Sequence, residues 1–254
     1  MNLNIQFYRN DDELISGITL KDVTQPENNN MALHCCDDAN AILKNRQQLA
    51  DALAIDLQKI VCANQTHSAN VYKVTADDFG RGATSVDTAI PNTDALYTFE
   101  KGVALCTFTA DCVPVSIYEP ESGLIAVIHS GWQGTVKEIS KHVMETLIQK
   151  EQIDPKKLQI HIGTALSQEK FEVDEDVYLK FKALGYADDF MYFNDTTRKY
   201  HIDNQKTVQM QFELAGVPTS QITIDSSCTF KKEQGFSYRQ NRAGGRHLTF
   251  LMQK

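Results

Sequence analysis

The fold of this chain is decided by residues 109–135, which read TADCVPVSIYEPESGLIAVIHSGWQGT. Two apolar runs in this stretch, Val113–Tyr118 and Leu124–Ile128, are separated by the turn residues Glu119–Gly123. Runs of this length around a turn that contains proline and glycine are typical of a β-hairpin. A hairpin among the central strands predicts a sheet that is at least partly antiparallel.

The ends of this hairpin carry two side chains that bind metals well. Cys112 directly precedes the first run and His129 directly follows the second, so antiparallel pairing returns the imidazole beside the thiol. His67 has a similar context, because it follows the apolar run Lys59–Ala63 within the string NQTHS. Two imidazoles and one thiolate suit zinc, and three protein ligands instead of four leave one coordination position open, as in catalytic zinc sites. The sequence therefore predicts a catalytic metal site of His67, Cys112 and His129.

Two other interpretations of these residues stay open. A single buried cysteine is usually a small apolar side chain, and an isolated histidine is usually a hydrogen-bonded structural residue. Cys112 could also act as a nucleophile with His129 as its base, which would make the protein a cysteine hydrolase. In that hydrolase His67 has no role, and Asp111, next to the cysteine, is poorly placed to reach His129.

Length and composition bound the class of protein. The chain has 254 residues, 42% of them hydrophobic and 23% charged, which is ordinary for a soluble globular protein. No Pro/Gly/Ser-rich linker, low-complexity tract or repeat divides it, so we expect a single domain over residues 1–254 and favour a monomer. The net charge of −8 argues against nucleic acid or an anionic membrane as a partner.

The amino terminus and the cysteines indicate the compartment. Residues 1–5 read MNLNI and lack the basic and apolar regions of a signal peptide, and no apolar stretch reaches membrane-spanning length. Of the six cysteines, Cys35 and Cys36 are adjacent, Cys62 and Cys106 sit inside strand-like runs, and no Cys-x-x-Cys pair occurs. These placements argue against a disulfide framework and against a closed structural zinc site. We therefore expect a cytoplasmic protein with reduced thiols.

Strand-like and helix-like segments alternate along the chain. Residues 37–40 are expected to cap a helix that runs to about Ala54, and Asp203 is expected to cap a helix that runs to Ala215. Residues 71–74 are predicted to pair beside the strand at 59–63. The other expected elements are strands at 103–108, 158–162, 222–224 and 247–252 and helices at 136–150 and 173–183. The fold class is therefore α/β (α+β), a layered domain whose mixed, partly antiparallel sheet is flanked by helices.

The residues after the hairpin indicate an anion site. Ser130–Thr135 leads into the amphipathic helix, and Gly131 and Gly134 would let a phosphate approach the amides at the start of that helix. The alternative is that both glycines only shape a tight turn. Arg239 and Arg246, near the carboxyl end of the chain, are further candidates for pairing with an anion.

Three motifs are similar to those of a known bacterial family: NQTH at 64–67, TADCVPV at 109–115 and HSGWQGT at 129–135. Members of this family were first labelled laccase-domain or polyphenol oxidase proteins and are now regarded as purine nucleoside phosphorylases. The resemblance covers nearly the whole chain from about residue 30, through shorter matches that read NR at 45–46, TDA at 93–95, FEV at 171–173, CT at 228–229 and FSYR at 236–239.

The resemblance implies a fold, a metal and an activity. The fold is one mixed α/β layered domain, and zinc is bound through His67, Cys112 and His129, which are also the expected catalytic residues. The activity is cleavage of adenosine, inosine and methylthioadenosine with phosphate, and in some members deamination of adenosine. Purine nucleoside and phosphate are then the expected partners, and the expected substrate-binding residues are Asn45, Arg46, Gln65, Gly131, Gly134 and Arg239.

The chain departs from the family pattern at three places. Gln133 stands where members usually have arginine within the glycine-rich turn, and Gly163–Gln168 replaces a stretch that usually contains proline. The amino-terminal Arg-x-Gly-Gly stretch of the family has no clear counterpart around Gly17–Leu20. The loss of a cation at position 133 weakens the predicted anion site. These changes bear on phosphate use and substrate preference, and none of them touches the expected metal ligands.

Other activities compete with phosphorolysis. Copper(II) would also enter a His/Cys site, so a copper-dependent, laccase-like polyphenol oxidase activity is one alternative. However, the chain has seven histidines and no His-x-His pair, the pattern on which multicopper laccases are built. The usual zinc deaminase motifs, His-x-Glu and Pro-Cys-x-x-Cys, do not occur either. The resemblance also leaves open a Cys/His hydrolase with a role in peptidoglycan fidelity.

Overall fold

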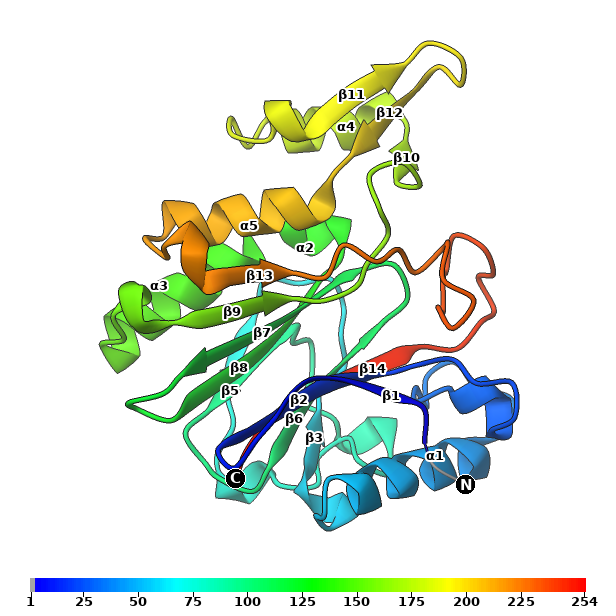
Figure 1. The fold of residues 1–254 in the computed structure, drawn as a ribbon, viewed down its shortest axis with the longest axis vertical. Helices are drawn as coiled ribbons and strands as arrows, with labels where there is room; N and C mark the ends of the chain where they lie inside the picture. The colour runs from blue at the N-terminus through cyan, green and yellow to red at the C-terminus, as the bar shows by residue number, and fades with distance from the viewer. Residues whose placement is uncertain (1–2) are drawn as a thin grey trace.

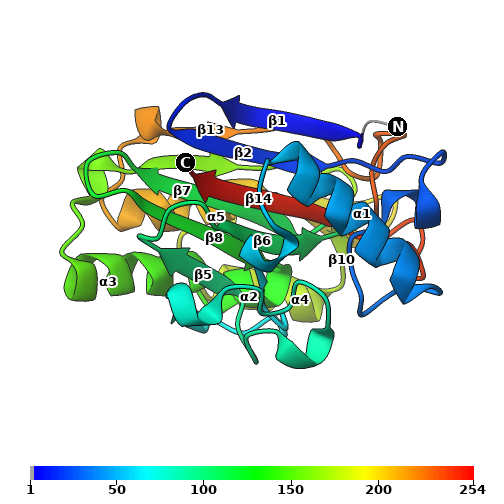
Figure 2. The same cartoon turned by 90° about the horizontal axis from the view of Figure 1, so that it is seen from below.

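Two large sheets stacked face to face form the body of the protein. The computed structural model describes residues 3–254. In Figure 1, α1 (Ala39–Ala52) covers the outside of a five-stranded sheet, and α3 (Ile139–Glu151) and α5 (Asn204–Leu214) cover the outside of a six-stranded sheet. Seen from below in Figure 2, α1 crosses in front of the first sheet. The layers therefore run helix, sheet, sheet, helix, and the predicted mixed α/β class is confirmed.

The five-stranded sheet contains the first and last strands of the described chain. Its order is β1-β2-β14-β6-β3. These strands are β1 (Ile5–Asn10), β2 (Leu14–Thr19), β14 (His247–Gln253), β6 (Ala104–Thr109) and β3 (Ile60–Cys62). In this sheet β3 pairs with β6 in parallel, and the other neighbours pair antiparallel.

The six-stranded sheet is built around the predicted hairpin. Its order is β13-β9-β7-β8-β5-β4, with parallel pairs at its two edges and antiparallel pairs between them. The strands are β13 (Ile222–Ile224), β9 (Gln159–Ile162), β7 (Val113–Glu119), β8 (Leu124–Ser130), β5 (Ala95–Thr98) and β4 (Val71–Lys73). In the β7–β8 hairpin, Pro114 lies opposite His129. The hairpin prediction is thus confirmed.

A third, smaller sheet lies at one end of the molecule, at the top of Figure 1. It contains β10 (Glu172–Val173), β12 (Lys199–Ile202) and β11 (Met191–Asn194), all paired antiparallel. The neighbouring helix α4 (Glu175–Lys182) buries Phe181 in a cluster with Phe171 and Ile202. A separate apolar cluster therefore supports this end.

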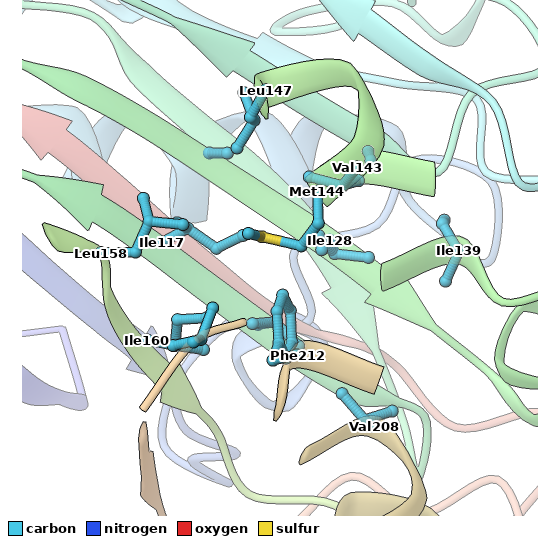
Figure 3. Packing of buried hydrophobic residues seen from close by; sticks show 14 of the residues in the cluster. Ile117, Ile128, Ile139, Val143, Met144, Leu147, Leu158, Ile160, Val208 and Phe212 are labelled. Carbon is cyan, nitrogen blue, oxygen red and sulfur yellow. The ribbon is translucent and has the colours of Figure 1, made fainter. Parts of the chain in front are cut away.

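Both faces of the central strands are buried, because alternate side chains pack into two different cores. In β8, Leu124, Ala126 and Ile128 belong to the helix-facing core, whereas Ile125 and Val127 belong to the core between the sheets. Strands buried on both faces read as continuous apolar runs, as this hairpin does. Figure 3 shows the helix-facing core, where Met144 of α3 and Phe212 of α5 share a cluster with Ile128.

The helix predictions hold with two differences, the first being that the helix expected at 173–183 begins only at Glu175, because Val173 lies in β10. Asp38 caps α1 by accepting a 2.9 Å hydrogen bond from the amide of Asn40, and Asp203 caps α5 by accepting one of 2.9 Å from the amide of Lys206. The amphipathic helix expected at 136–150 is instead two helices, α2 (Trp132–Val136) and α3. They are separated at Glu138, whose φ of 57° is left-handed and cannot continue a right-handed helix.

The predicted pairing of residues 71–74 beside residues 59–63 is wrong. β3 lies in the five-stranded sheet, whereas β4 pairs in parallel with β5 in the six-stranded sheet. The loop between β3 and β4 crosses from one sheet to the other, and His67 lies in it. Among residues 3–254, no helix combines the length and the apolar character that crossing a membrane requires.

Candidate metal centre

His67, Cys112 and His129 meet at one end of the two large sheets. Cys112 lies in the bend between β6 and β7, His129 lies in β8, and His67 lies in the crossing loop with a left-handed φ of 56°. One donor atom from each side chain lies within 4.8 Å of the other two. The Sγ of Cys112 is 3.9 Å from Nε2 of His67, and the two imidazole rings are 4.8 Å apart between centroids. The structure brings together the three predicted ligands.

A buried carboxylate orients one of these imidazoles. Asp94, just before β5, lies 2.8 Å by its Oδ1 from Nδ1 of His129, and both side chains are almost fully buried. An imidazole whose Nδ1 donates to a carboxylate presents Nε2 as the ligand atom, the usual second contact behind a metal-binding histidine. Asp94 therefore fixes which nitrogen of His129 points toward Cys112.

The same carboxylate also holds the loop that carries His67. Asp94 accepts hydrogen bonds from the backbone amides of Thr66, His67 and Ser68 at 3.1, 3.1 and 2.7 Å, and from the Ser68 hydroxyl at 2.7 Å. One side chain thus positions two of the three ligands, from two different segments. Asp94 belongs to the family match TDA at 93–95, but its sequence context predicts no role for it.

Gly131 allows the ligands to come this close. A β-carbon built at Gly131 would lie 2.5 Å from Cδ2 of His67 and 2.9 Å from Sγ of Cys112. Side chains do not tolerate contacts of that length, so only glycine leaves both ligands in place. Gly134 differs, because it lies inside α2 and a β-carbon there would meet Ile139 at an ordinary 3.5 Å.

The predicted anion site at the start of the helix has little structure to support it. The helix that starts there, α2, has five residues, and Gly131 is its N-cap. The backbone of Gly131 is in an extended conformation with φ −67°. Gly131 therefore leaves room for His67 and Cys112 to approach each other, whereas Gly134 is an interior residue of α2.

The bend that carries Cys112 is tied to the carboxyl-terminal segment. Asp111 has a φ of 85° and accepts hydrogen bonds from the Thr229 hydroxyl at 2.6 Å and from the Arg239 amide at 2.7 Å. Arg239 is exposed, and its Nη1 donates to the carbonyl of Glu172 at 2.9 Å. These contacts bring Arg239, a predicted substrate-binding residue, to the chain segment that precedes Cys112.

The predicted residues Asn45 and Arg46 are buried in α1. The Arg46 guanidinium donates to the carbonyls of Met31, Gly82 and Ala83 at 2.8, 2.6 and 2.7 Å. Asn45 donates to the carbonyls of Pro26 and Asn30, both at 2.9 Å. Both side chains therefore hold loops against α1.

Gln65 pairs with the end of β6. Its Nε2 donates to the Phe108 carbonyl at 2.8 Å, and its Oε1 accepts from the Phe108 amide at 2.7 Å. Gln65 and Arg46 nevertheless line one small cavity of about 120 Å³, together with Phe108 and the exposed His34. This cavity lies beside the loop that carries His67.

The electrostatics of the three ligands favour a deprotonated thiol. Burial by itself would raise the pKa of the Cys112 thiol, but His129 and His67 outweigh it and lower that pKa to about 6. Burial by itself would lower the pKa of the His129 imidazole, but Cys112 and Asp94 outweigh it and raise that pKa to about 9. The thiolate is the form of cysteine that binds metals, so the donor set fits zinc and, as a second choice, copper.

Comparison with known proteins assigns the family. Residues 21–254 match the model of the family described as multi-copper polyphenol oxidoreductase laccase. The chain belongs to this family. The match covers His67, Cys112 and His129, and it confirms the resemblance seen in the three sequence motifs.

Several relatives are named for activities on purine nucleosides. The chain is 36% identical over 225 residues to the purine nucleoside phosphorylase YlmD of Geobacillus stearothermophilus, covering 87% of this chain and 82% of that protein. It is 34% identical to YlmD of Bacillus subtilis, covering 98% and 92%. It is also 32% identical to the adenosine deaminase RL5 of an unknown prokaryotic organism, covering 89% and 87%.

Solved structures of the family share the fold. The crystal structure of the hypothetical protein YfiH of Bacillus licheniformis superposes with a TM-score of 0.91 at 29% identity, covering 98% of this chain and 99% of that one. The structure of YlmD from Geobacillus stearothermophilus superposes with a TM-score of 0.89 at 33% identity, covering 95% and 92%. The stacked sheets are therefore the fold of the family.

Proposed function

We propose that this protein is a zinc-dependent purine nucleoside phosphorylase that cleaves adenosine, inosine and methylthioadenosine with phosphate. The observation that carries the proposal is the three-ligand centre of His67, Cys112 and His129, whose geometry Asp94 supports from behind. Three ligands suit a catalytic ion that keeps one position for substrate or water. The names of the YlmD relatives supply the substrate class.

The reaction makes specific demands on the residues around the centre. Cleavage of an N-glycosidic bond builds positive charge on the ribose and negative charge on the departing base, so the site needs an anion beside the sugar and a group that stabilises the base. A bound zinc would supply Lewis-acid charge at the centre. We assign phosphate binding to the exposed Arg239, and contact with the nucleoside to the cavity lined by Gln65 and Arg46. Gly131 leaves room for His67 and Cys112 to approach each other.

The decisive experiment follows the products of three nucleosides. Zinc-loaded protein is incubated with adenosine, inosine or methylthioadenosine, with and without phosphate, and the products are separated. We expect phosphate-dependent release of the free base together with ribose 1-phosphate, or its methylthio analogue. We also expect Cys112→Ala to abolish release and to lower zinc content. Cys36→Ala, which removes a cysteine outside the centre, is the matched control and should keep both.

Three results would contradict the proposal. Base release that does not depend on phosphate would make the enzyme a nucleoside hydrolase. Full activity and full zinc content in Cys112→Ala would show that Cys112 is not part of the metal site. Wild-type protein that releases no base, but shows thiol-dependent amidase activity, would favour the Cys/His hydrolase, for which the lowered pKa of Cys112 is the supporting observation.

Adenosine deamination is a second candidate, supported by the similarity to the deaminase RL5. The open metal position is the feature that deamination needs, because a bound ion can activate water for attack on the purine ring. The same product separation tests it, since inosine then forms from adenosine without phosphate. Unchanged adenosine in phosphate-free buffer would exclude this activity.

Oxidation of phenols is a third candidate, supported by the description of the family. We expect it to follow copper loading, because copper(II) outcompetes zinc at nitrogen ligands. The test measures dye oxidation and base release in samples that contain only zinc or only copper. Copper-free protein that oxidises phenolic dyes would contradict this explanation.

A further inference from the structure

The small cavity beside the crossing loop lies between two segments that Arg46 holds together. One segment precedes α1 and carries His34, and the other begins at Gly82. The Arg46 guanidinium donates to the first segment through the Met31 carbonyl at 2.8 Å. It donates to the second segment through the carbonyls of Gly82 and Ala83, at 2.6 and 2.7 Å. α1 therefore fixes two walls of this cavity in the protein without substrate.

Most of the cavity wall is apolar. Small-molecule sites typically combine such walls with a few polar groups that fix the orientation of the ligand. The volume of about 120 Å³ is smaller than that of most sites for a whole small molecule, so the cavity suits one part of a nucleoside. A flat base fits apolar walls better than a ribose, which carries several hydroxyl groups. The apolar lining residues are Leu33, Cys62, Ala63, Val86, Ala89 and Phe108.

The polar side chains of the cavity differ in what they leave for a ligand. Both ends of the Gln65 amide are bound to the backbone of Phe108, and Arg46 is buried and bound to three carbonyls. His34 and Asn64 also line the cavity, and both are exposed. Neither of these two side chains forms a hydrogen bond within residues 3–254. His34 and Asn64 are therefore the polar groups that a ligand can reach and that are free to bind it.

The imidazole of His34 can both donate and accept. Partial burial and the nearby charges of Arg246, Arg46 and His129 lower the pKa of His34 to about 4, so the ring is neutral at pH 7. A neutral imidazole has one N–H donor and one acceptor nitrogen, and its two tautomers exchange them. The influence of His129 also places His34 near the candidate metal centre. Its ring stands edge-on to Phe108, with 5.9 Å between the centroids.

The proposed substrates need such a group. Adenosine has an amino group at C6 and an unprotonated N1, whereas inosine has an oxo group at C6 and an N1–H. Donor and acceptor are thus exchanged along this edge of the purine. A carboxylate offers only acceptors, and an ammonium or guanidinium offers only donors. A site that accepts both purines therefore needs a neutral group that can change its role, because a buried polar group left unpaired by the ligand costs affinity.

We propose that His34 contacts the position-6 edge of the purine and lets one site take both 6-amino and 6-oxo bases. His34 is favoured over Asn64 because its ring packs against Phe108 and is held at the cavity. The identity of the ligand as a purine rests on the proposed function. The availability of His34 rests on the cavity and on the hydrogen bonds that occupy Gln65 and Arg46.

Equilibrium dialysis of adenine and hypoxanthine against zinc-loaded protein, without phosphate, tests this assignment. The variants are His34→Gln, His34→Glu and Asn64→Asp. His34→Gln keeps a donor and an acceptor, whereas His34→Glu has the same size but at pH 7 only accepts. Asn64→Asp is the matched control, because it places the same negative charge at the other free polar residue of the cavity.

The expected result is a change of preference between the two bases. His34→Gln should bind both within about threefold of wild type, whereas His34→Glu should keep adenine and bind hypoxanthine about tenfold or more weakly, because its oxo group would face a carboxylate. Asn64→Asp should affect both bases equally. Equal effects on both bases in His34→Glu, a change of preference in Asn64→Asp, or no binding of either base to wild type at millimolar concentration would overturn the assignment.

This experiment and the test of phosphorolysis fail separately, because dialysis does not measure turnover. Protein that shows the expected change of preference but releases no base from a nucleoside would refute only the proposed function. Phosphate-dependent release of base, together with unchanged preference in His34→Glu, would refute only the role of His34.

Discussion

Asp94 connects His67 and His129, two candidate metal ligands that are far apart in the sequence. It contacts the His129 ring and three consecutive amides of the loop around His67, and its side chain has no exposure to solvent. A carboxylate behind a metal-binding histidine typically changes metal affinity 10–100-fold. In this protein, a substitution of Asp94 would also remove the hydrogen bonds that hold the loop around His67.

We expect Asp94→Asn to lower zinc affinity by about 100-fold, at the upper end of that range, because both effects act together. The measurement is competition against a chelator of known affinity. Asp78→Asn is the control, since Asp78 is another buried aspartate that accepts backbone and side-chain hydrogen bonds outside the centre. Equal zinc affinity in the two variants would show that Asp94 does not position the ligands.

Gly131 and Gly134 form a natural pair for a second prediction. Gly131→Ala places a methyl group 2.5 Å from His67 and 2.9 Å from the Cys112 sulfur, so it should abolish zinc binding. The methyl group of Gly134→Ala, inside α2, would have no neighbour closer than Ile139 at 3.5 Å. This substitution should therefore raise the free energy of unfolding by about 0.5–1 kcal/mol, because alanine is preferred over glycine in helices. Zinc content and urea denaturation test both. Zinc retention in Gly131→Ala would mean that the ligands can move apart at little cost.

The sequence predicted that His67, Cys112 and His129 meet, but not what holds them in place. These three candidate ligands could be proposed from the sequence because zinc restricts its ligands to a few residue types, and the hairpin brings two of them together. Asp94 acts through contacts with residues 26–35 positions away, which no local pattern reveals. Asn45 and Arg46 were predicted to bind substrate, and their buried hydrogen bonds to backbone carbonyls could not be predicted because the carbonyls belong to distant parts of the sequence.

Among the elements, α1 depends on a buried cation. Arg46 donates to three carbonyls from two loops, and its guanidinium also lies 4.9 Å from the centroid of the Phe108 ring. A lysine cannot reproduce this fork of donors. α1 is therefore held to two loops by the hydrogen bonds of Arg46, and to the five-stranded sheet by the contact of Arg46 with Phe108 and by Leu49 and Ala50.

We expect Arg46→Lys to lower the free energy of unfolding by about 2–4 kcal/mol, since it leaves buried carbonyls without donors. Urea denaturation measures this, with Lys44→Arg on the exposed face of α1 as the control. If Arg46 instead acts only on substrate, the KM for phosphate or nucleoside will rise while the free energy of unfolding stays unchanged.

Elements with strong local signals were predicted well, and elements defined by distant partners were not. Residues only a few positions apart determine the β7–β8 hairpin and the aspartate-capped helices α1 and α5. The edge strand β1 reads IQFYRN and was not predicted, because its half-exposed residues show no alternation. The strand β4 was paired wrongly, because the loop between β3 and β4 leads to the other sheet, where β4 pairs with β5.

At the scale of the whole molecule, buried histidines make stability depend on pH. His247, at the start of β14, is fully buried; its Nδ1 donates to the Thr19 carbonyl at 2.7 Å, and its Nε2 accepts from the Phe236 amide at 2.7 Å. These bonds fit only the neutral ring. Burial accordingly lowers the pKa of His247 to about 4, below the ordinary value of 6.5. The unfolded chain therefore takes up a proton in a range where the folded protein does not.

The stabilising contribution of His247 should be complete above pH 6.5 and be lost as the pH falls toward 4, because protonation then favours the unfolded state. We expect the stability difference between the parent protein and a His247→Gln variant to shrink by roughly 2–3 kcal/mol between pH 7 and pH 4.5. Urea denaturation at both pH values measures it, in a Cys112→Ala background so that loss of metal in acid does not contribute. His142→Gln, which changes an exposed histidine, should leave the difference constant. A difference that stays constant or grows in acid for His247→Gln would mean that the folded protein accommodates the charged ring, contrary to the hydrogen bonds that surround it.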